Sequence, residues 1–317
     1  MKAIRFHEFG GADALRVDEV ERPEPGAGEV LIRVAVAGVN YADTMLRAGT
    51  YLTKPPLPHT PGFEVAGVVE AIGEGVASCQ VEQRVMAKFQ GGGYAEYAVA
   101  RAEDVVRVPD DLDFGRATAL LAQGLTALGL LKDLRAGQTI LVHAAAGGVG
   151  SLLVQLAKHR GARVIGTAST AEKLQLVESL GADAAVNYTE ADWTERVLAA
   201  TGGQGVDLLI EMAGGEVGGQ NVKLLAAGAT MIVYGAASGR DFPISALGLM
   251  NKNLTVRGYT LYSETPGTMA HFTSELMLHV KAGRLRITVR EFALADAAAA
   301  HRAVEGRQTT GKVVLTV

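Results

Sequence analysis

A glycine-rich segment at residues 145–150 has the residue types and spacing that most directly indicate chemistry. Gly147 and Gly150 occupy the second and third glycine positions of the pattern G-x-G-x-x-G, and Ala145 stands at the first. Glycines allow a pyrophosphate to approach the backbone, and the unpaired N–H groups of a following helix favour an anion. The segment therefore predicts a dinucleotide-binding turn. The alternative is a tight strand-to-helix turn of the kind found in any α/β protein.

The residues on either side of this turn predict the strand and the helix that such a site requires. Ile140, Leu141 and Val142 form a short apolar run typical of a buried parallel strand. Apolar residues at the helical spacing i, i+3, i+4, i+7 follow the turn, at Val149, Leu152, Leu153 and Leu156. A strand, a glycine-rich turn and a helix in this order are the context in which the fingerprint indicates a dinucleotide.

The overall composition argues against several classes of protein. The net charge of −4 offers no basic surplus for nucleic acid. No apolar run approaches the roughly 18 residues of a membrane span, and the N-terminus lacks a long apolar, signal-like segment. The single cysteine, Cys79, excludes intrachain disulfides and fits a reducing compartment. We therefore expect a cytoplasmic protein that binds neither nucleic acid nor membranes.

The pattern of the chain changes near residue 122. Before it, short β patterns are broken by Gly/Pro clusters, with one helix expected over Tyr41–Arg47. The expected strands there are Lys2–Phe6, Val30–Val36, Val65–Ile72, Arg84–Ala87, Tyr94–Val99 and Val105–Val108. After it, strands alternate with helical patterns, near 139–143, 163–167, 184–187, 206–211, 229–234 and 254–258. This alternation predicts an α/β fold with a doubly wound parallel sheet, and a last strand at 312–317 is expected to return to the first domain.

The end of the second strand of this sheet bears on the choice between NADH and NADPH. A site for NAD usually places Asp or Glu about 20 residues past the glycines, where it binds the ribose 2′-OH. Ser169 takes that place here, and Lys173 follows one helical turn later. A neutral hydroxyl leaves room for a 2′-phosphate and the ammonium supplies charge for it, so the pair favours NADPH. Tyr188, just after the third strand, could close the same pocket; the alternative for Lys173 is a solvated helix residue.

No group of residues has the spacing of a metal site. Zinc sites need clustered Cys, His or carboxylate ligands, whereas this chain has one cysteine and seven scattered histidines. His143, which ends the first strand of the sheet, is expected to be packed or hydrogen-bonded rather than a ligand. We therefore expect no metal.

Eight segments together resemble a known family, the zinc-free medium-chain reductases of the quinone oxidoreductase and zeta-crystallin branch. They are Gly38–Asp43, Gly49–Tyr51, Pro61–Gly67, Gly92–Tyr97, Gly124–Thr126, His143–Gly150, Gly166–Ser169 and Gly311–Leu315. The resemblance spans the chain and implies a Rossmann NADPH-binding domain at 123–259. It also implies a β-rich, partly barrel-like GroES-like catalytic domain at 1–122 and 260–317. The zinc-dependent relatives carry Cys where Asn40 stands and His where Phe63 stands, which agrees with the absence of a metal.

The resemblance also implies roles for individual residues. Those implied to bind the cofactor are Asn40, Tyr51, Thr126, Gly147, Gly148, Val149, Ser169, Lys173, Tyr188, Tyr234, Gly235, Ala236, Ser238, Leu261 and Tyr262. Tyr51 is the one residue expected to take part in catalysis, at the border of cofactor and substrate. The alternatives are a packed aromatic for Tyr51, a turn residue for Asn40 and ordinary sheet core for Tyr234. Some relatives have a second tyrosine where Met45 stands, and methionine cannot donate a strong hydrogen bond.

The leading hypothesis is an NADPH-dependent reductase of quinones or similar conjugated carbonyls, in which the cofactor carries the hydride and the protein orients it. The nearest alternative is an enone or enoyl reductase on the same scaffold. The alternative from another class is a non-catalytic NADPH-binding protein, structural or RNA-binding, and the acidic balance weakens its RNA-binding form. The strand at 254–258 is expected at a sheet edge, where the resemblance implies a homodimer.

Overall fold

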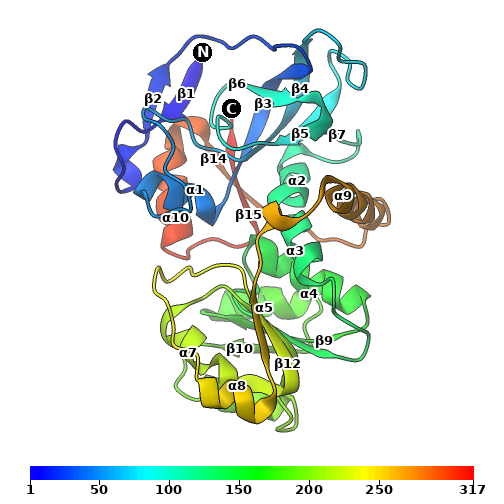
Figure 1. Cartoon of the computed structure of the whole chain (residues 1–317). Coiled ribbons are helices and arrows are strands. Elements are labelled where there is room, and N and C mark those ends of the chain that lie inside the picture. The colour runs from blue at the N-terminus through cyan, green and yellow to red at the C-terminus, as the bar shows by residue number, and fades with distance from the viewer. The chain divides into compact units, whose positions relative to one another are not determined.

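A computed structural model describes residues 1–317, which pack as two compact units (Figure 1). The first unit contains residues 1–122 and 287–317, and the second contains residues 123–286. Residues 260–286, which we expected in the first domain, group with the second unit, where the long helix α9 (Pro266–Lys281) packs against α3 (Leu125–Leu130). No helix in the chain is both long and apolar enough to cross a lipid bilayer.

The second unit is built on a six-stranded parallel sheet. Its strands are β8 (Thr139–Val142), β9 (Arg163–Ala168), β10 (Ala184–Asn187), β11 (Val206–Glu211), β12 (Leu225–Val233) and β13 (Thr255–Gly258). They lie in the order β10-β9-β8-β11-β12-β13, and every neighbouring pair is parallel. This is the order of a doubly wound dinucleotide-binding sheet, so the predicted α/β fold is confirmed.

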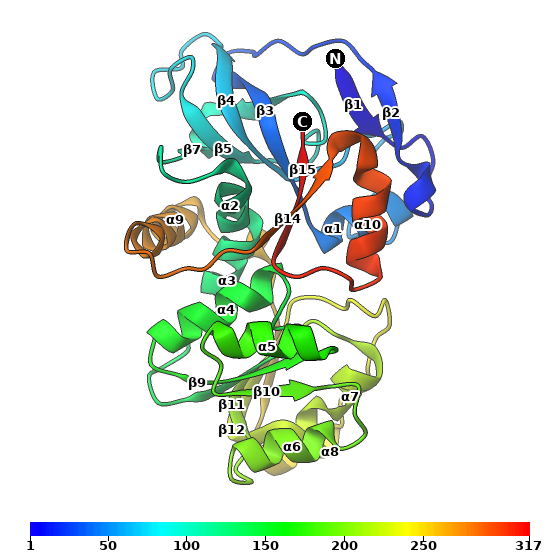
Figure 2. The same cartoon turned by 180° about the vertical axis from the view of Figure 1, so that it is seen from behind.

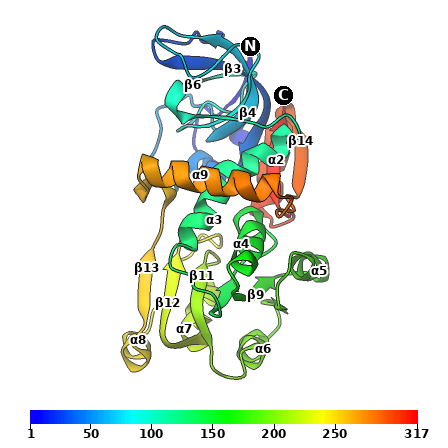
Figure 3. The same cartoon turned by 90° about the vertical axis from the view of Figure 1, so that its right-hand side faces the viewer.

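Helices cover both faces of this sheet because the chain leaves β8 in opposite directions, first toward β10 and later toward β13. Right-handed crossovers then place the first two helices on one face and the later ones on the other. They are α4 (Gly148–His159), α5 (Ala171–Ser179), α6 (Trp193–Ala200), α7 (Gly215–Leu224) and α8 (Ala246–Lys252). α6, α7 and α8 pack in a row (Figure 3), and Ile140, Leu141 and Val142 are fully buried, as a strand covered on both faces requires.

The first unit is built on a largely antiparallel sheet in the order β14-β15-β3-β4-β5-β7, with β6 also paired to β3. Its strands are β3 (Glu29–Val39), β4 (Glu64–Ile72), β5 (Arg84–Lys88), β6 (Tyr97–Arg101), β7 (Val105–Arg107), β14 (Val289–Ala293) and β15 (Lys312–Thr316). β15 is the predicted last strand, and it pairs with β3 as well as with β14. β1 (Lys2–Arg5) pairs with β2 (Arg16–Glu19), a strand that we did not predict.

Three helices accompany this sheet: α1 (Tyr41–Ala48), α2 (Phe114–Ala119) and α10 (Ala297–Glu305). α1 packs against α10 (Figures 1 and 2), and α2 packs against β3 and β4. α1 begins directly after β3, where the carboxylate of Asp43 accepts a hydrogen bond from the backbone N–H of Asn40 at 2.8 Å. It ends at Ala48, one residue beyond the predicted Arg47, and Gly49 caps it with a φ of 73°, in the left-handed region that glycine adopts without strain.

Candidate cofactor and substrate site

The glycine-rich turn joins β8 to α4, and its glycines have different surroundings. A Cβ on Gly150 would lie 2.3 Å from the carbonyl oxygen of Ala144 and 2.8 Å from the Cα of Ala145, so the turn packs directly on this glycine. A Cβ on Gly147, the residue before α4, would meet only the Ala144 oxygen, at 3.2 Å. Gly150 therefore serves the fold, whereas the absence of a side chain at Gly147 leaves the backbone open to a ligand.

The start of α4 supplies the donors that an anion needs. The first N–H groups of an α-helix have no acceptor within the helix, and the dipole of the helix places partial positive charge at this end. Gly148 and Val149 form the beginning of α4, beside the open backbone of Gly147. These features fit the pyrophosphate of a dinucleotide.

Gln123 is a polar residue at this turn that our sequence analysis did not identify. The residue is only 8% exposed, and its carboxamide packs on the Cα of Gly148, where a Cβ would lie 2.4 Å from Cδ, Oε1 and Nε2. Its Oε1 has no hydrogen-bond partner within the protein. A buried amide oxygen needs a donor, so a hydroxyl or N–H group of a bound dinucleotide could satisfy Oε1, whereas its pyrophosphate, which only accepts, could not. The only signal in the sequence was its place next to Gly124–Thr126, ahead of the helix that carries Thr126.

The residues expected around an adenosine 2′-phosphate lie close to one another in the second unit. Ser169 directly follows β9, and Lys173 lies in the first turn of α5, which Thr170 caps by accepting the Lys173 backbone N–H at 3.4 Å. The backbone N–H of Tyr188 donates to the Ala168 carbonyl at 3.1 Å, which brings the end of β10 to the end of β9. Ser169, Lys173 and Tyr188 are all partly exposed, so a ligand can reach them.

The loop after β12 lies at the same edge of the sheet. The backbone N–H of Tyr234 donates to the Glu211 carbonyl at 3.0 Å, and that of Ser238 to the Ala213 carbonyl at 2.9 Å. Gly235 and Ala236 lie between them. Burial, with a smaller contribution from Glu211, raises the pKa of Tyr234, so its hydroxyl keeps its proton.

The remaining cofactor candidates in the second unit follow β13. Leu261 and Tyr262 belong to a short 3-10 helix, Leu261–Ser263. The backbone N–H of Tyr262 donates to the Thr260 hydroxyl at 3.4 Å. Tyr262 is 51% exposed. The second unit therefore brings the predicted residues after β8, β9, β10, β12 and β13 to the carboxyl edge of one parallel sheet, where such folds bind their ligands.

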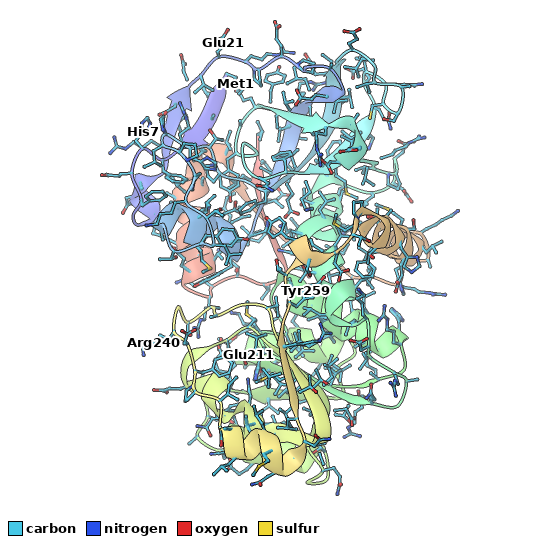
Figure 4. The ribbon with its side chains drawn as sticks, viewed as in Figure 1. Met1, His7, Glu21, Glu211, Arg240 and Tyr259 are labelled. Carbon is cyan, nitrogen blue, oxygen red and sulfur yellow. The ribbon has the colours of Figure 1, made fainter.

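A buried polar network supports this edge from inside the unit. His143 is fully buried; its Nδ1 pairs with the Thr167 hydroxyl at 2.8 Å and its Nε2 with Asn221 Oδ1 at 2.9 Å. Because an amide oxygen only accepts, His143 donates from Nε2. Asn221 in turn donates to the carboxylate of Glu211, which also accepts from the Gly214 N–H at 2.6 Å. Glu211 is labelled in Figure 4, in the second unit. His143 is therefore hydrogen-bonded in the core, as predicted.

Asn40 and Tyr51, the two remaining site candidates, belong to the first unit. Asn40 precedes α1, and its side chain contacts Glu64 and Lys312 rather than only the backbone of a turn. The ring of Tyr51 lies against that of Phe63, with centroids 5.9 Å apart and planes inclined by 48°. No three His, Cys, Asp or Glu side chains of the chain come together as a group that could hold a metal ion.

The doubly wound sheet, its glycine-rich turn and the separate β-rich unit define a two-domain dehydrogenase or reductase. Residues 26–110 match the family described as alcohol dehydrogenase GroES-like domain, and residues 148–276 match the family described as zinc-binding dehydrogenase. The quinone oxidoreductase of Pseudomonas aeruginosa is 37% identical over 323 residues, which cover 99% of each chain. The chain therefore belongs to the quinone oxidoreductase family of medium-chain dehydrogenases/reductases, which confirms the resemblance.

The structure of Escherichia coli quinone oxidoreductase complexed with NADPH superposes with a TM-score of 0.94 at 31% identity, over 100% of both chains. The 2-haloacrylate reductase of a Burkholderia species is 36% identical over 333 residues, covering 99% of this chain and 98% of the relative. The family thus contains relatives named for reduction of a quinone and for reduction of an acrylate.

Proposed function

We propose that the protein is an NADPH-dependent quinone oxidoreductase. The arrangement that carries this proposal is the carboxyl edge of the second unit, where an open backbone at Gly147 is combined with Ser169 and Lys173 in place of an acidic residue. The full-length relatives named quinone oxidoreductase and the neighbouring structure that contains NADPH support it.

Bound NADPH would supply the hydride for the reaction. The chain would bind the pyrophosphate with the N–H groups at the start of α4 and would meet the 2′-phosphate with Ser169, Lys173 and Tyr188. Reduction of a quinone to a hydroquinone takes up a proton in addition to the hydride. Tyr51 is our candidate for the residue that hydrogen-bonds the acceptor oxygen and passes it a proton, and water is the alternative.

Reduction of an activated carbon–carbon double bond is the second candidate, because a full-length relative is named 2-haloacrylate reductase. A stopped-flow screen of NADPH oxidation with quinones, enones, acrylates and aldehydes separates the two. Faster turnover with 1,4-naphthoquinone than with enones or acrylates supports the quinone proposal, and the reverse order supports the second candidate. Tight NADPH binding without turnover of any acceptor would indicate a non-catalytic binding protein.

Lys173→Ala is expected to weaken NADPH binding by roughly 10- to 100-fold, because hydrogen bonds to charged groups contribute about 1.5–3 kcal/mol. NADH has no 2′-phosphate, so its dissociation constant should change by less than about twofold on the same reasoning. Fluorescence titration with both cofactors measures the two constants. Lys158→Ala is the matched control, because Lys158, on α4, pairs with Asp183 and its substitution should affect the binding of neither cofactor. Equal losses for NADPH and NADH in Lys173→Ala would rule out the 2′-phosphate assignment.

We also propose that the protein acts as a homodimer in the cytoplasm. β13 is an edge strand of its sheet, and Leu247 and Met250 on the preceding helix α8 are 67% and 69% exposed. An open strand edge beside exposed apolar side chains favours pairing with a second copy. Light scattering should give a dimer for the parent protein and a monomer for Leu247→Glu/Met250→Glu, and an unchanged mass would argue against this interface. The single, buried Cys79 supports a reducing compartment.

A further inference from the structure

A buried ion pair in the first unit contacts the side chain of Asn40. Lys312 begins β15, Asn40 follows β3 and Glu64 begins β4, and these three strands are neighbours in the sheet. Lys312 and Glu64 are 1% and 0% exposed. The Nζ of Lys312 donates to Oε1 of Glu64 and, at 3.2 Å, to Oδ1 of Asn40.

The ion pair between Lys312 and Glu64 fixes the orientation of the Asn40 carboxamide. Nδ2 of Asn40 donates to Oε1 of Glu64 at 2.9 Å, while Oδ1 accepts from Lys312. A carboxylate can only accept and an ammonium can only donate, so a rotated carboxamide would face a donor with a donor and an acceptor with an acceptor. Because Lys312 and Glu64 are buried, water cannot replace the contacts that such a rotation would lose.

Asn40, Glu64 and Lys312 form a cluster, which we call the Asn40 cluster, and only Asn40 among the three is accessible to solvent. The second oxygen of Glu64 accepts from the Ala122 N–H at 2.8 Å, and Lys312 also donates to the Val39 carbonyl at 3.3 Å. Glu64 occupies its position because Gly38 in β3 has no Cβ, which would lie 2.5 Å from Oε1. Asn40 itself is partly exposed, and its Nδ2 carries a second hydrogen beyond the one donated to Glu64.

We propose that Lys312 and Glu64 are positioning residues that hold Nδ2 of Asn40 as a hydrogen-bond donor toward an uncharged oxygen of the bound ligands. That oxygen belongs to the nicotinamide half of NADPH or to the carbonyl of the acceptor, and this identification rests on the proposed function. A buried ion pair is weak evidence for stability, because desolvation offsets the attraction between the charges. Preorganisation is the advantage it provides here, because a donor already oriented before binding needs no rearrangement during the reaction.

A double-mutant cycle tests the proposal. Asn40→Ala should lower kcat/KM for 1,4-naphthoquinone, or raise the NADPH dissociation constant, by roughly 100-fold, as loss of a preorganised donor does. Lys312→Met/Glu64→Gln removes both charges together and leaves no unpaired buried ion, and the new amide can pair with either end of Asn40. This double variant should lower kcat/KM, or raise the NADPH dissociation constant, by roughly 10- to 100-fold, in whichever of the two Asn40→Ala changes. Adding Asn40→Ala to it should change that quantity by less than about threefold more. Circular dichroism and thermal melting establish that each variant is folded.

Lys252→Met is the matched control, because Lys252 donates to three backbone carbonyls in the second unit and contacts no part of the Asn40 cluster. The effects of Lys252→Met and Asn40→Ala on kcat/KM and on the NADPH dissociation constant should be additive. Additive losses in the Lys312/Glu64 cycle, or no effect of Asn40→Ala on either quantity, would overturn the proposal. If the parent protein does not reduce quinones, the proposed function fails, and the cycle is then read from the NADPH dissociation constant alone.

Discussion

Gly150→Ala is expected to lower the free energy of unfolding by about 3 kcal/mol, near the upper end of the usual cost of overpacking. The added Cβ would lie 2.3 Å from the Ala144 carbonyl oxygen and 2.8 Å from the Ala145 Cα, and both atoms belong to the backbone of the turn. Neither can move without displacing the end of β8 from α4. The expected sign is the reverse of the usual one, because alanine normally stabilises a helical position over glycine by about 1 kcal/mol.

Gly147→Ala is the matched variant three residues away, and it should separate folding from binding. Gly147 has φ −77° and ψ 179°, which any residue adopts, and an added Cβ would meet only the Ala144 oxygen, at 3.2 Å. The free energy of unfolding should therefore change by less than about 1 kcal/mol. A methyl group would, however, occupy the space through which a pyrophosphate approaches, so the NADPH dissociation constant should rise by at least about tenfold.

Urea unfolding and calorimetric titration of the two variants provide the measurements. Normal NADPH affinity in Gly147→Ala would contradict the placement of the pyrophosphate at this turn. Unchanged stability in Gly150→Ala would contradict the close packing of the turn on α4.

The sequence was informative about the second unit because its structure follows local patterns. The strands there are short apolar runs separated by helical periodicity, and alternation of this kind leads to one parallel sheet with few alternatives. Once that sheet is predicted, residues that follow different strands must share its carboxyl edge. The sequence alone therefore suffices to place Ser169 and Tyr188 together, although they are 19 positions apart.

The features that the sequence did not reveal depend on contacts between distant parts of the chain. β2 is a short strand with mostly exposed residues, so it lacks the apolar alternation that marks a half-buried strand. Residues 260–286 group with the second unit because α9 packs on α3, and nothing in the local pattern of α9 specifies that neighbour. The contact between Lys312 and Glu64 joins residues 248 positions apart, and one sequence offers no means of pairing them.

Asp43 is expected to make the stability of the protein decrease as the pH rises toward neutrality. Its carboxyl group is fully buried and accepts N–H hydrogen bonds from Asn40 at 2.8 Å and Gly62 at 3.0 Å. Burial raises its pKa from an ordinary value of 3.8 to about 7; the two N–H bonds and Lys312 oppose the rise, and Glu64 adds to it. The folded protein therefore holds a proton on Asp43 between these two pH values, where the unfolded chain has lost it.

The direction of the effect follows from proton linkage. A carboxyl group with a raised pKa in the folded protein adds to the free energy of unfolding. This addition is fully present below the unfolded pKa of 3.8 and is lost as the pH rises through the folded pKa of about 7. At 1.36 kcal/mol for each pKa unit, a change from about pH 4.5 to about pH 8 should remove roughly 3 kcal/mol. Asp43→Asn cannot ionise, so the free energy of unfolding of the parent protein should fall relative to this variant by that amount over the same range.

Urea unfolding of both proteins across this pH range measures the difference, and it cancels the titration of all other groups that the two share. Asp13→Asn provides the control, because the Asp13 side chain is 93% exposed and its substitution should leave the pH profile parallel to that of the parent. Parallel profiles for Asp43→Asn as well would mean that Asp43 is already ionised at acid pH, so that its N–H donors and Lys312 outweigh burial. The pH profile therefore measures whether burial or the N–H donors and Lys312 determine the charge of Asp43. This carboxyl group lies where α1 begins, next to Asn40, which we propose as a hydrogen-bond donor to the bound ligands.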